Sequence, residues 1–374
     1  MFLPKKDECT TCTAYANTKI KADQLRQNLI EHHENVELSR ANKQRDKARA
    51  AIDESFFCGI ADLEQVSPCP KGFSKDFFYV SKLSCYNFTT LDLKTRKGHC
   101  YRWDQRQGRR GANEMASARL HFYNNVVPKS VTEVTEWSDS CGAQNRGHKV
   151  SAAIIQILKD PRNNITRFNK KWMTSGHSES EVDVIHSVLE RKSKDKEFFH
   201  PEQWITFNQD ATDDSGQKFE AHKLGLDMIP IYDVTNYAML IFLNKRKGLD
   251  NTTGQSVLIN WNNLHQMEYG RAISPFTLVV KENFYPGVKG VTVDTQLSKL
   301  TRSSQKKKCI PKLIVLRNDS SHPFPITKKL KSGLLKLCKK MQIPHQFQQF
   351  YHSLLETGHL EDEDEDDVER DDEL

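Results

Sequence analysis

Three acidic residues stand where carboxylates could act together on metal ions. Asp62 ends the apolar run Phe56–Ala61, Asp139 ends the run Val134–Ser138, and Asp183 lies near the start of an expected helix. In phosphodiester cleavage, two Mg²⁺ ions about 3.5–4 Å apart activate the attacking oxygen and stabilise the leaving one. Mg²⁺ prefers oxygen ligands, and convergent carboxylates supply them. These residues therefore predict metal-dependent phosphoryl-transfer chemistry.

Four residues in or near the expected helix at 181–192 are candidates for the third acid. They are Glu179, Glu181, Asp183 and Glu190. Ser178-x-x-Glu181 fits a capping box, which would give Glu181 a structural role. Asp183, His186 and Glu190 share one helix face because they are spaced i, i+3 and i+7. Asp183 is favoured over Glu190 because it lies nearer the helix start, and His186 is either an auxiliary site residue or an interior histidine.

The elements expected around these acids alternate in a characteristic order. The strands are expected at Ser55–Val66, Phe77–Phe88, Lys97–Trp103, Val131–Ser138 and Ile165–Trp172. The helices are expected at Gly111–Tyr123, Lys149–Leu158 and Glu181–Lys192. The order β-β-β-α-β-α-β-α is that of the RNase H-like fold, an α/β fold with a mixed five-stranded sheet flanked by helices. Ligands bind such sheets at the carboxyl ends of parallel strands, where Asp62 and Asp139 are expected.

Four segments of different composition divide the chain. We expect a CxxC-containing helical arm over 1–50, an RNase H-like catalytic core over 51–200, a smaller α/β extension over 201–358 and a disordered acidic tail over 359–374. The extension is expected to hold a helix from His200 and a basic helix over Thr327–Met341. Its expected strands are Met239–Lys245, Ser256–Trp261, Phe276–Val280 and Lys312–Leu316.

The pair Cys9 and Cys12 has the spacing of metal ligands. Zinc needs four ligands in a structural site, and His32 and His33 are the nearest candidates in sequence. The pair is therefore expected to be either part of a Zn²⁺ site that residues outside this chain complete, or no site at all. His177 follows Gly176 in an expected loop, from which it could also approach the carboxylates.

The charge of the chain is strongly divided. Residues 361–374 carry eleven acids and one arginine, a net charge of −10. Because the whole chain has a net charge of +6, the other 360 residues carry a net charge of +16. A basic body suits the approach to phosphate backbones. The basic residues expected to contact DNA are Arg109, Arg110, Lys170, Lys171, Arg191 and Lys192. Lysine runs such as Lys306–Lys308 are also typical of nuclear import signals.

At 37% hydrophobic residues and 28% charged residues, the chain is too polar to suggest a membrane protein. It contains no apolar run of the length that spans a bilayer, and its start lacks an apolar signal-peptide core. We therefore expect an intracellular, nuclear protein with no membrane partner, in which the cysteines are free thiols or metal ligands.

Several motifs resemble the eukaryotic DDE-type transposase-derived proteins. The most specific are Trp137-Ser138-Asp139-Ser140-Cys141-Gly142-x-Gln144-Asn145 and the stretch from Gly176-His177 to Glu190. Others are Pro4-Lys5-Lys6-Asp7-x-Cys9-x-x-Cys12 and Asp62-Leu63-x-Gln65. Together they cover roughly residues 1–355. The chain departs from the family at Ala143, where glycine is usual, and at Glu179, where histidine is common.

The resemblance implies an RNase H-like nuclease that cuts and joins DNA with Mg²⁺ or Mn²⁺. Carried over by position, its acids are Asp62, Asp139 and either Asp183 or Glu190. Family members usually have more sequence before Pro4, so we expect an N-terminally shortened member that acts as a homodimer. Two alternatives stay open: a catalytically inactive, transposon-derived nuclear DNA-binding or interaction protein, and an RNase H-like ribonuclease or exonuclease.

Overall fold

A computed structural model describes residues 9–18, 23–139, 147–242, 244, 246–271, 274, 276–296 and 316–357 of the chain. It divides into two compact units, each built from three separate stretches. The first unit comprises Met1–Ile60, Val127–Ser180 and Ala238–Ile310, and the second comprises Ala61–Val126, Glu181–Tyr237 and Pro311–Leu374. The units interleave along the chain, whereas the sequence suggested contiguous segments.

The first unit is built on a mixed sheet with three parallel strands. β1 (Phe56–Leu63) pairs with β5 (Glu133–Ser138), which pairs with β6 (Arg167–Trp172), and both pairs are parallel. β5 is buried along its whole length, as expected of a strand with both faces covered. The helix α5 (His148–Lys159) buries eight residues, and its apolar run supplies much of the core.

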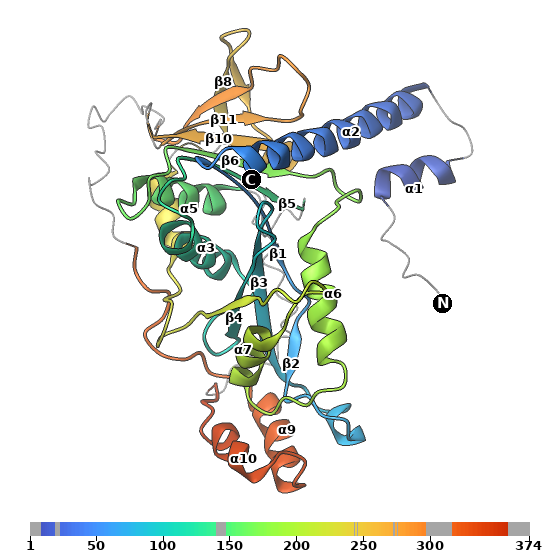
Figure 1. Ribbon diagram of the computed structural model, residues 1–374, viewed down its shortest axis with the longest axis vertical. Helices are drawn as coiled ribbons and strands as arrows, with labels where there is room; N and C mark the ends of the chain where they lie inside the picture. The colour runs from blue at the N-terminus through green and yellow to red at the C-terminus, as the bar shows by residue number, and fades with distance from the viewer. Residues whose placement is uncertain are drawn as a thin grey trace. The chain divides into compact units, whose positions relative to one another are not determined.

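Antiparallel strands extend this sheet beyond β6 in the order β10, β11, β12, β8 and β9 (Figure 1). The bounds of these strands are Gln266–Gly270, Thr277–Lys281, Val291–Asp294, Lys247–Asp250 and Ser256–Leu258, respectively. β10 and β11 alternate buried and half-buried residues, the pattern of a sheet with one covered face. The helix α8 (Val234–Ile241) precedes them in the chain.

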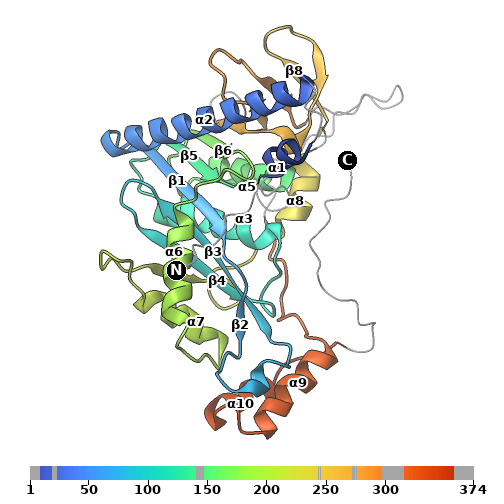
Figure 2. The same cartoon turned by 90° about the vertical axis from the view of Figure 1, so that its right-hand side faces the viewer.

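The long helix α2 (Asp23–Ile52) runs beside β5 and β6, as Figure 2 shows. Its buried residues are Val36, Ser39, Lys43 and Ala50. These residues are spaced three, four and seven positions apart, so they lie on one face of the helix. Two of the four are polar. The exposed Leu25 near the start of α2 is not part of this face. The short helix α1 (Thr10–Asn17) precedes α2.

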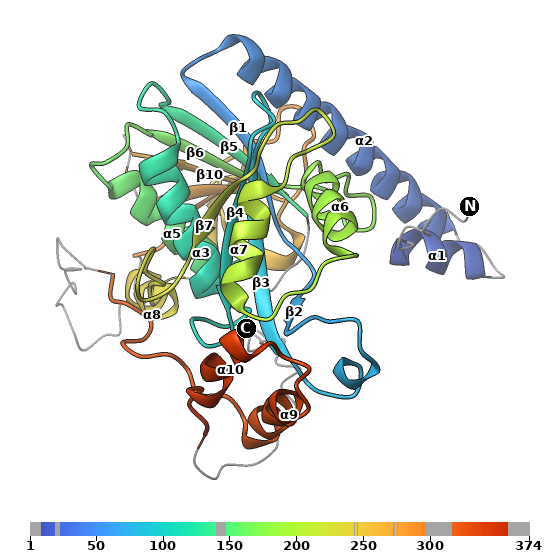
Figure 3. The same cartoon turned by 60° about the horizontal axis from the view of Figure 1, so that its bottom comes forward.

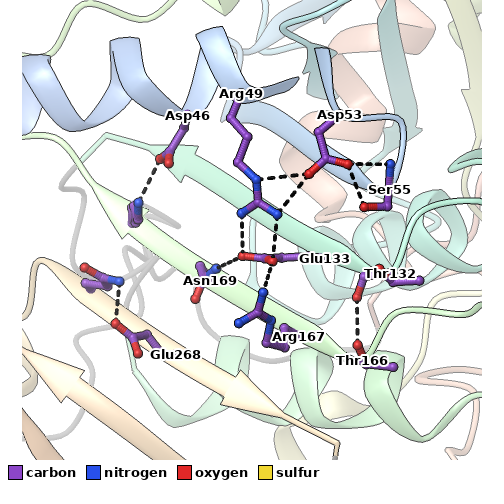
Figure 4. Close-up of polar contacts among 12 residues, drawn as sticks. Asp46, Arg49, Asp53, Ser55, Thr132, Glu133, Thr166, Arg167, Asn169 and Glu268 are labelled. Carbon is purple, nitrogen blue, oxygen red and sulfur yellow. Dashed lines mark hydrogen bonds and ion pairs between the residues drawn. The ribbon is translucent and has the colours of Figure 1, made fainter. Parts of the chain in front are cut away.

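Charged side chains fasten the end of α2 to the sheet (Figure 4). The guanidinium of Arg49 donates to both carboxylate oxygens of Glu133, each at 3.0 Å, and also to Asp53. Arg167 donates to the same Glu133 carboxylate. Burial opposes ionisation of Glu133, but its bonds to the two arginines outweigh burial and lower its pKa. Asp46, about one helical turn before Arg49, accepts bonds from Trp137 and Lys171.

The second unit contains an antiparallel hairpin flanked by short strands and helices. β3 (Leu83–Asp92) pairs with β4 (Gly98–Asp104), and the carboxylate of Asp92 accepts a backbone bond in the turn between them. β2 (Ser67–Cys69) pairs with β3, β7 (Glu220–Lys223) pairs parallel to β4, and the end of β1 adjoins β3 through the bond from Glu64 N–H to Asn87 O.

Helices cover this part of the sheet. The helix α7 (Pro201–Asp210) lies against β4 and β7 (Figure 3). The others in this unit are α3 (Ala112–His121) with a π-helical turn at Phe122–Val126, α6 (Val182–Ser193), α9 (Lys328–Lys339) and α10 (His345–His352). α10 is anchored by Tyr351, whose hydroxyl donates to the carbonyl of Phe199 at 2.7 Å. Two short 3₁₀ turns, Lys75–Phe77 and Trp261–Asn263, complete the elements.

The expectation of an α/β protein with a mixed sheet flanked by helices is confirmed, and the sheet is large and mostly open. The expected sheet of five strands is too small, because twelve strands take part within the described ranges. The additional strands have short, half-polar sequences that carry little periodic signal. None of the helices in the described ranges is long and apolar enough to cross a membrane.

Several expected elements differ from those observed. The expected strand at Met239–Lys245 is wrong, because Met239 lies in α8; a short apolar run fits either element by pattern alone. The second expected strand begins at Leu83 rather than Phe77, which ends a 3₁₀ turn. The arm is two helices rather than one. The strand expected at Lys312–Leu316 and the acidic tail lie almost wholly outside the described residues.

Candidate metal-binding sites

Asp62 occupies a distinctive position near the end of β1. It is the one residue of this eight-residue strand that is not buried. Its Oδ1 accepts the backbone N–H of Leu63 at 2.7 Å, which orients the carboxylate along the strand. Asp62 is thus a half-exposed carboxylate on an otherwise buried strand.

The helix α6 brings two further side chains to Asp62. Asp183 is in the first turn of α6 and His186 is one turn later. One ligand atom from each of Asp62, Asp183 and His186 lies within 4.8 Å of the others. Asp183 thereby lies at the positive end of the dipole of α6. The three residues therefore form a group that could hold a divalent ion, which we call the acidic site.

His186 is held by a hydrogen bond inside the second unit. Its Nε2 lies 3.1 Å from the hydroxyl of Thr89 on β3. Burial, with a smaller effect from the charge of Arg102, lowers the pKa of His186 to about 3. The imidazole is therefore neutral at pH 7, the form in which histidine binds metals. Metal-bound histidines commonly have such a partner on the second ring nitrogen.

Glu190 is not a member of the acidic site as the structure describes it. It lies seven residues after Asp183 on α6, about 10 Å along the helix axis. The expected capping box is wrong, because Glu181 is itself the N-cap, in helical geometry and with no side-chain capping bond. The choice of Asp183 as the third acid therefore depends on its proximity to Asp62 and not on a capping role for Glu181.

Asp139 directly follows β5 in the first unit. The hydroxyl of Ser138 donates to its backbone carbonyl at 3.1 Å. The ladder between β1 and β5 ends at the pair Ile60–Trp137. Asp139 is not one of the residues that the structure, over its described ranges, groups with Asp62. The polar residues 140–145, which belong to the sequence motif around Asp139, lie outside the described residues.

A second group combines thiols and imidazoles in the first unit. Cys9 is the N-cap of α1, and its Sγ lies 3.2 Å from Nε2 of His32 on α2. The Sγ of Cys12 lies 3.4 Å from Nε2 of His177 and 3.6 Å from Nε2 of His33. Ligand atoms of Cys9, Cys12, His32 and His177 all lie within 4.8 Å of one another. We call these four residues the Cys–His cluster.

The expectation that His177 approaches the carboxylates is wrong, since it meets Cys12. The prediction was based on the Gly176-His177 dipeptide. No local sequence pattern relates this dipeptide to Cys12, which lies 165 residues earlier. Burial lowers the pKa of His32 and of His177, and the charges of neighbouring histidines lower both further. Neutral imidazoles are thus favoured in this cluster.

A third group, which sequence reasoning missed, lies on the parallel strands β4 and β7. His99 Nδ1 is 3.2 Å from His222 Nε2, and Glu220 lies beside both rings. Burial lowers the pKa of both histidines to about 4. Glu220 also pairs with Lys97. These side chains provide hydrogen-bond and ion-pair partners for one another. The group is therefore best explained as polar packing between β4 and β7 and not as a metal site.

Two of the basic residues expected to contact DNA are not on the surface. Lys170 is fully buried and bonds Glu136 at 2.6 Å, and Lys171 is buried against Asp46. That part of the expectation is wrong because both faces of this central strand are covered. Arg109 and Arg110 are exposed. Arg191 pairs with Asp214, and Lys192 donates to the carbonyl of Thr212.

Comparison with protein-family models, curated proteins and solved structures finds no match for this chain.

Proposed function

We propose that this chain is a transposase-like enzyme that cleaves DNA phosphodiesters with Mg²⁺ or Mn²⁺, or a domesticated form of one. The observation that carries the proposal is the convergence of Asp62, Asp183 and His186. Two carboxylates and a neutral imidazole suit a hard divalent ion that keeps part of its water shell.

The strand topology supports an RNase H-like core around this site. The strand order includes the run β4-β3-β1-β5-β6, in which β1, β5 and β6 are parallel and β3 is antiparallel to β4. Asp139 directly follows β5 and is the further acid that the sequence motif predicts for the reaction.

Each residue then has a defined role. Asp62, Asp183 and His186 would hold the divalent ion, His186 as a neutral ligand steadied by Thr89. Asp139 would supply a further carboxylate for the reaction. When bound, the metal supplies Lewis-acid stabilisation of charge on the phosphate. Water adds to phosphorus as the P–O3′ bond breaks, leaving a 3′-OH. That hydroxyl then attacks a target phosphodiester and displaces a second 3′-OH.

The direct test is nicking of supercoiled plasmid by the full chain across a range of Mn²⁺ and Mg²⁺ concentrations. Asp62→Asn, Asp139→Asn and Asp183→Asn should each abolish nicking, since amides are poor metal ligands. Glu190→Gln on the same helix should retain it and serves as the matched control. Nicking retained in Asp183→Asn but lost in Glu190→Gln would assign the third acid to Glu190.

The second candidate is a non-catalytic DNA-binding or interaction protein. The acidic site favours it in one respect, because this group contains two carboxylates and an imidazole rather than three carboxylates. Folded wild-type protein that binds DNA in a salt-sensitive way, but does not nick it at any Mn²⁺ or Mg²⁺ concentration, would establish this candidate and overturn the first.

A further inference from the structure

We propose that Cys9, Cys12, His32 and His177 bind one Zn²⁺ ion, which fastens α1 and the turn at Thr174–His177 to α2. The four residues come from three places in the sequence. All lie within the first unit. The inference does not depend on the proposed enzymatic function.

The separations within the cluster fit a tetrahedral site. With Zn–S near 2.3 Å and Zn–N near 2.0 Å, a tetrahedron places sulfur and nitrogen ligands about 3.5 Å apart. The two sulfur–nitrogen separations are 3.2 Å for Cys9–His32 and 3.4 Å for Cys12–His177. A thiol–imidazole hydrogen bond would explain either pair alone. It does not require all four ligand atoms to lie within 4.8 Å of one another.

The backbone around the cluster is built for close approach. Gly176 has φ +73°, and a Cβ at this position would lie 2.7 Å from both Cα and Cβ of Cys9. The turn closes with a bond from His177 N–H to Thr174 O at 3.1 Å. Arg40 of α2 bonds Glu179 just after this turn, which holds the segment beside the histidines of α2. Glycine is thus required for His177 to reach Cys12.

The helix α1 needs a tether that its own residues do not provide. It has eight residues, none of them buried. Isolated helices shorter than about 12 residues are marginal in water. Cys9, immediately before the helix, is buried at 7% exposure. Coordination by Cys9 and Cys12 would attach the first turn of α1 to the unit and supply the missing stabilisation.

The ligand types select the metal. Two thiolates and two imidazoles form a set typical of structural Zn²⁺ sites, whereas Mg²⁺ and Mn²⁺ prefer oxygen. The competing use of a CxxC pair is a disulfide, as in thiol oxidoreductases. That use does not account for imidazoles beside both sulfurs.

His33 provides a matched control. It is exposed and lies 3.6 Å from Cys12, but it is not one of the four convergent residues. His32 is half-buried and bonds Cys9. Adjacent residues point about 100° apart on a helix, so only one of the two histidines can complete the tetrahedron.

The test is metal analysis of the full chain purified under reducing conditions without chelator. We expect one zinc per chain, and reconstitution with Co²⁺ should give the visible bands of tetrahedral thiolate coordination. Cys12→Ser, His32→Ala and His177→Ala should reduce zinc to a small fraction of wild type, while His33→Ala retains it. Circular dichroism confirms that each variant is folded.

Wild-type protein without zinc that also fails to bind Co²⁺ would overturn the proposal, whatever the variants do. Loss of zinc from His33→Ala with retention in His32→Ala would overturn the assignment of His32. Because these readouts measure metal and not nicking, they are separate from the test of the acidic site.

Discussion

The Nζ of Lys170 lies 2.6 Å from Oε1 of Glu136, and both side chains are fully buried on neighbouring parallel strands. Lys170 also donates to the hydroxyl of Ser138 at 2.9 Å. Removing one partner from a buried ion pair leaves the other charge in a low-dielectric environment.

Lys170→Met should therefore destabilise the protein by about 3–5 kcal/mol, because Glu136 loses its counter-charge. The double variant Lys170→Met with Glu136→Leu should recover most of this loss. Urea unfolding gives both free energies. A single variant as stable as wild type would show that the pair contributes nothing to folding.

Gly176→Ala should weaken zinc binding and destabilise the first unit, because the new Cβ would overlap the backbone of Cys9. Gly254 has a nearly identical φ of +70°, but a Cβ there would have no neighbour within 4 Å. Gly254→Ala should cost only the backbone strain, about 1 kcal/mol. Thermal unfolding and zinc analysis of the two variants distinguish the effect of the close contact from that of backbone strain. Equal losses of stability in Gly176→Ala and Gly254→Ala would argue against a tight contact at Cys9.

Glu114 should make stability fall as pH rises. Burial raises its pKa from 4.5 to about 7 in the folded protein. The unfolded chain therefore releases this proton at lower pH than the folded one, so stability is full below pH 4.5 and declines until about pH 7. A shift of this size corresponds to roughly 3 kcal/mol.

Glu114→Gln removes this titration but keeps an oxygen to accept the N–H of Arg109. The stability of wild type relative to the variant should fall by about 3 kcal/mol between pH 4.5 and 7, as urea unfolding at several pH values would show. A constant difference would mean that Glu114 stays ionised in the fold.

Arg109→Gln and Arg110→Gln should each weaken DNA binding, because these side chains are exposed. For every phosphate that a variant no longer neutralises, the slope of log K against log salt should decrease in magnitude by about 0.9. Arg162→Gln removes an equally charged residue that is already paired with Asp160, and it should leave the slope unchanged. Fluorescence anisotropy over a salt series measures this, and equal slopes for all three variants would exclude a specific arginine contact.

Local sequence patterns determined the elements whose signal is strong. The apolar run of α5, the hairpin turn at Asp92 and the strand preceding Asp62 could all be predicted, because each depends on neighbouring residues. The position of Asp62 at a strand end and the spacing of Cys9 and Cys12 were likewise readable from the chain.

The tertiary structure decided which of these residues meet. It joined His177 to Cys12 across 165 positions, selected Asp183 rather than Glu190 beside Asp62, and buried Lys170, whose charge had suggested exposure. It also made a buried face on α2 from partly polar residues. Periodicity reports only whether a residue faces a core, whereas these outcomes depend on which distant segments pack together and on whether a buried charge finds a partner there.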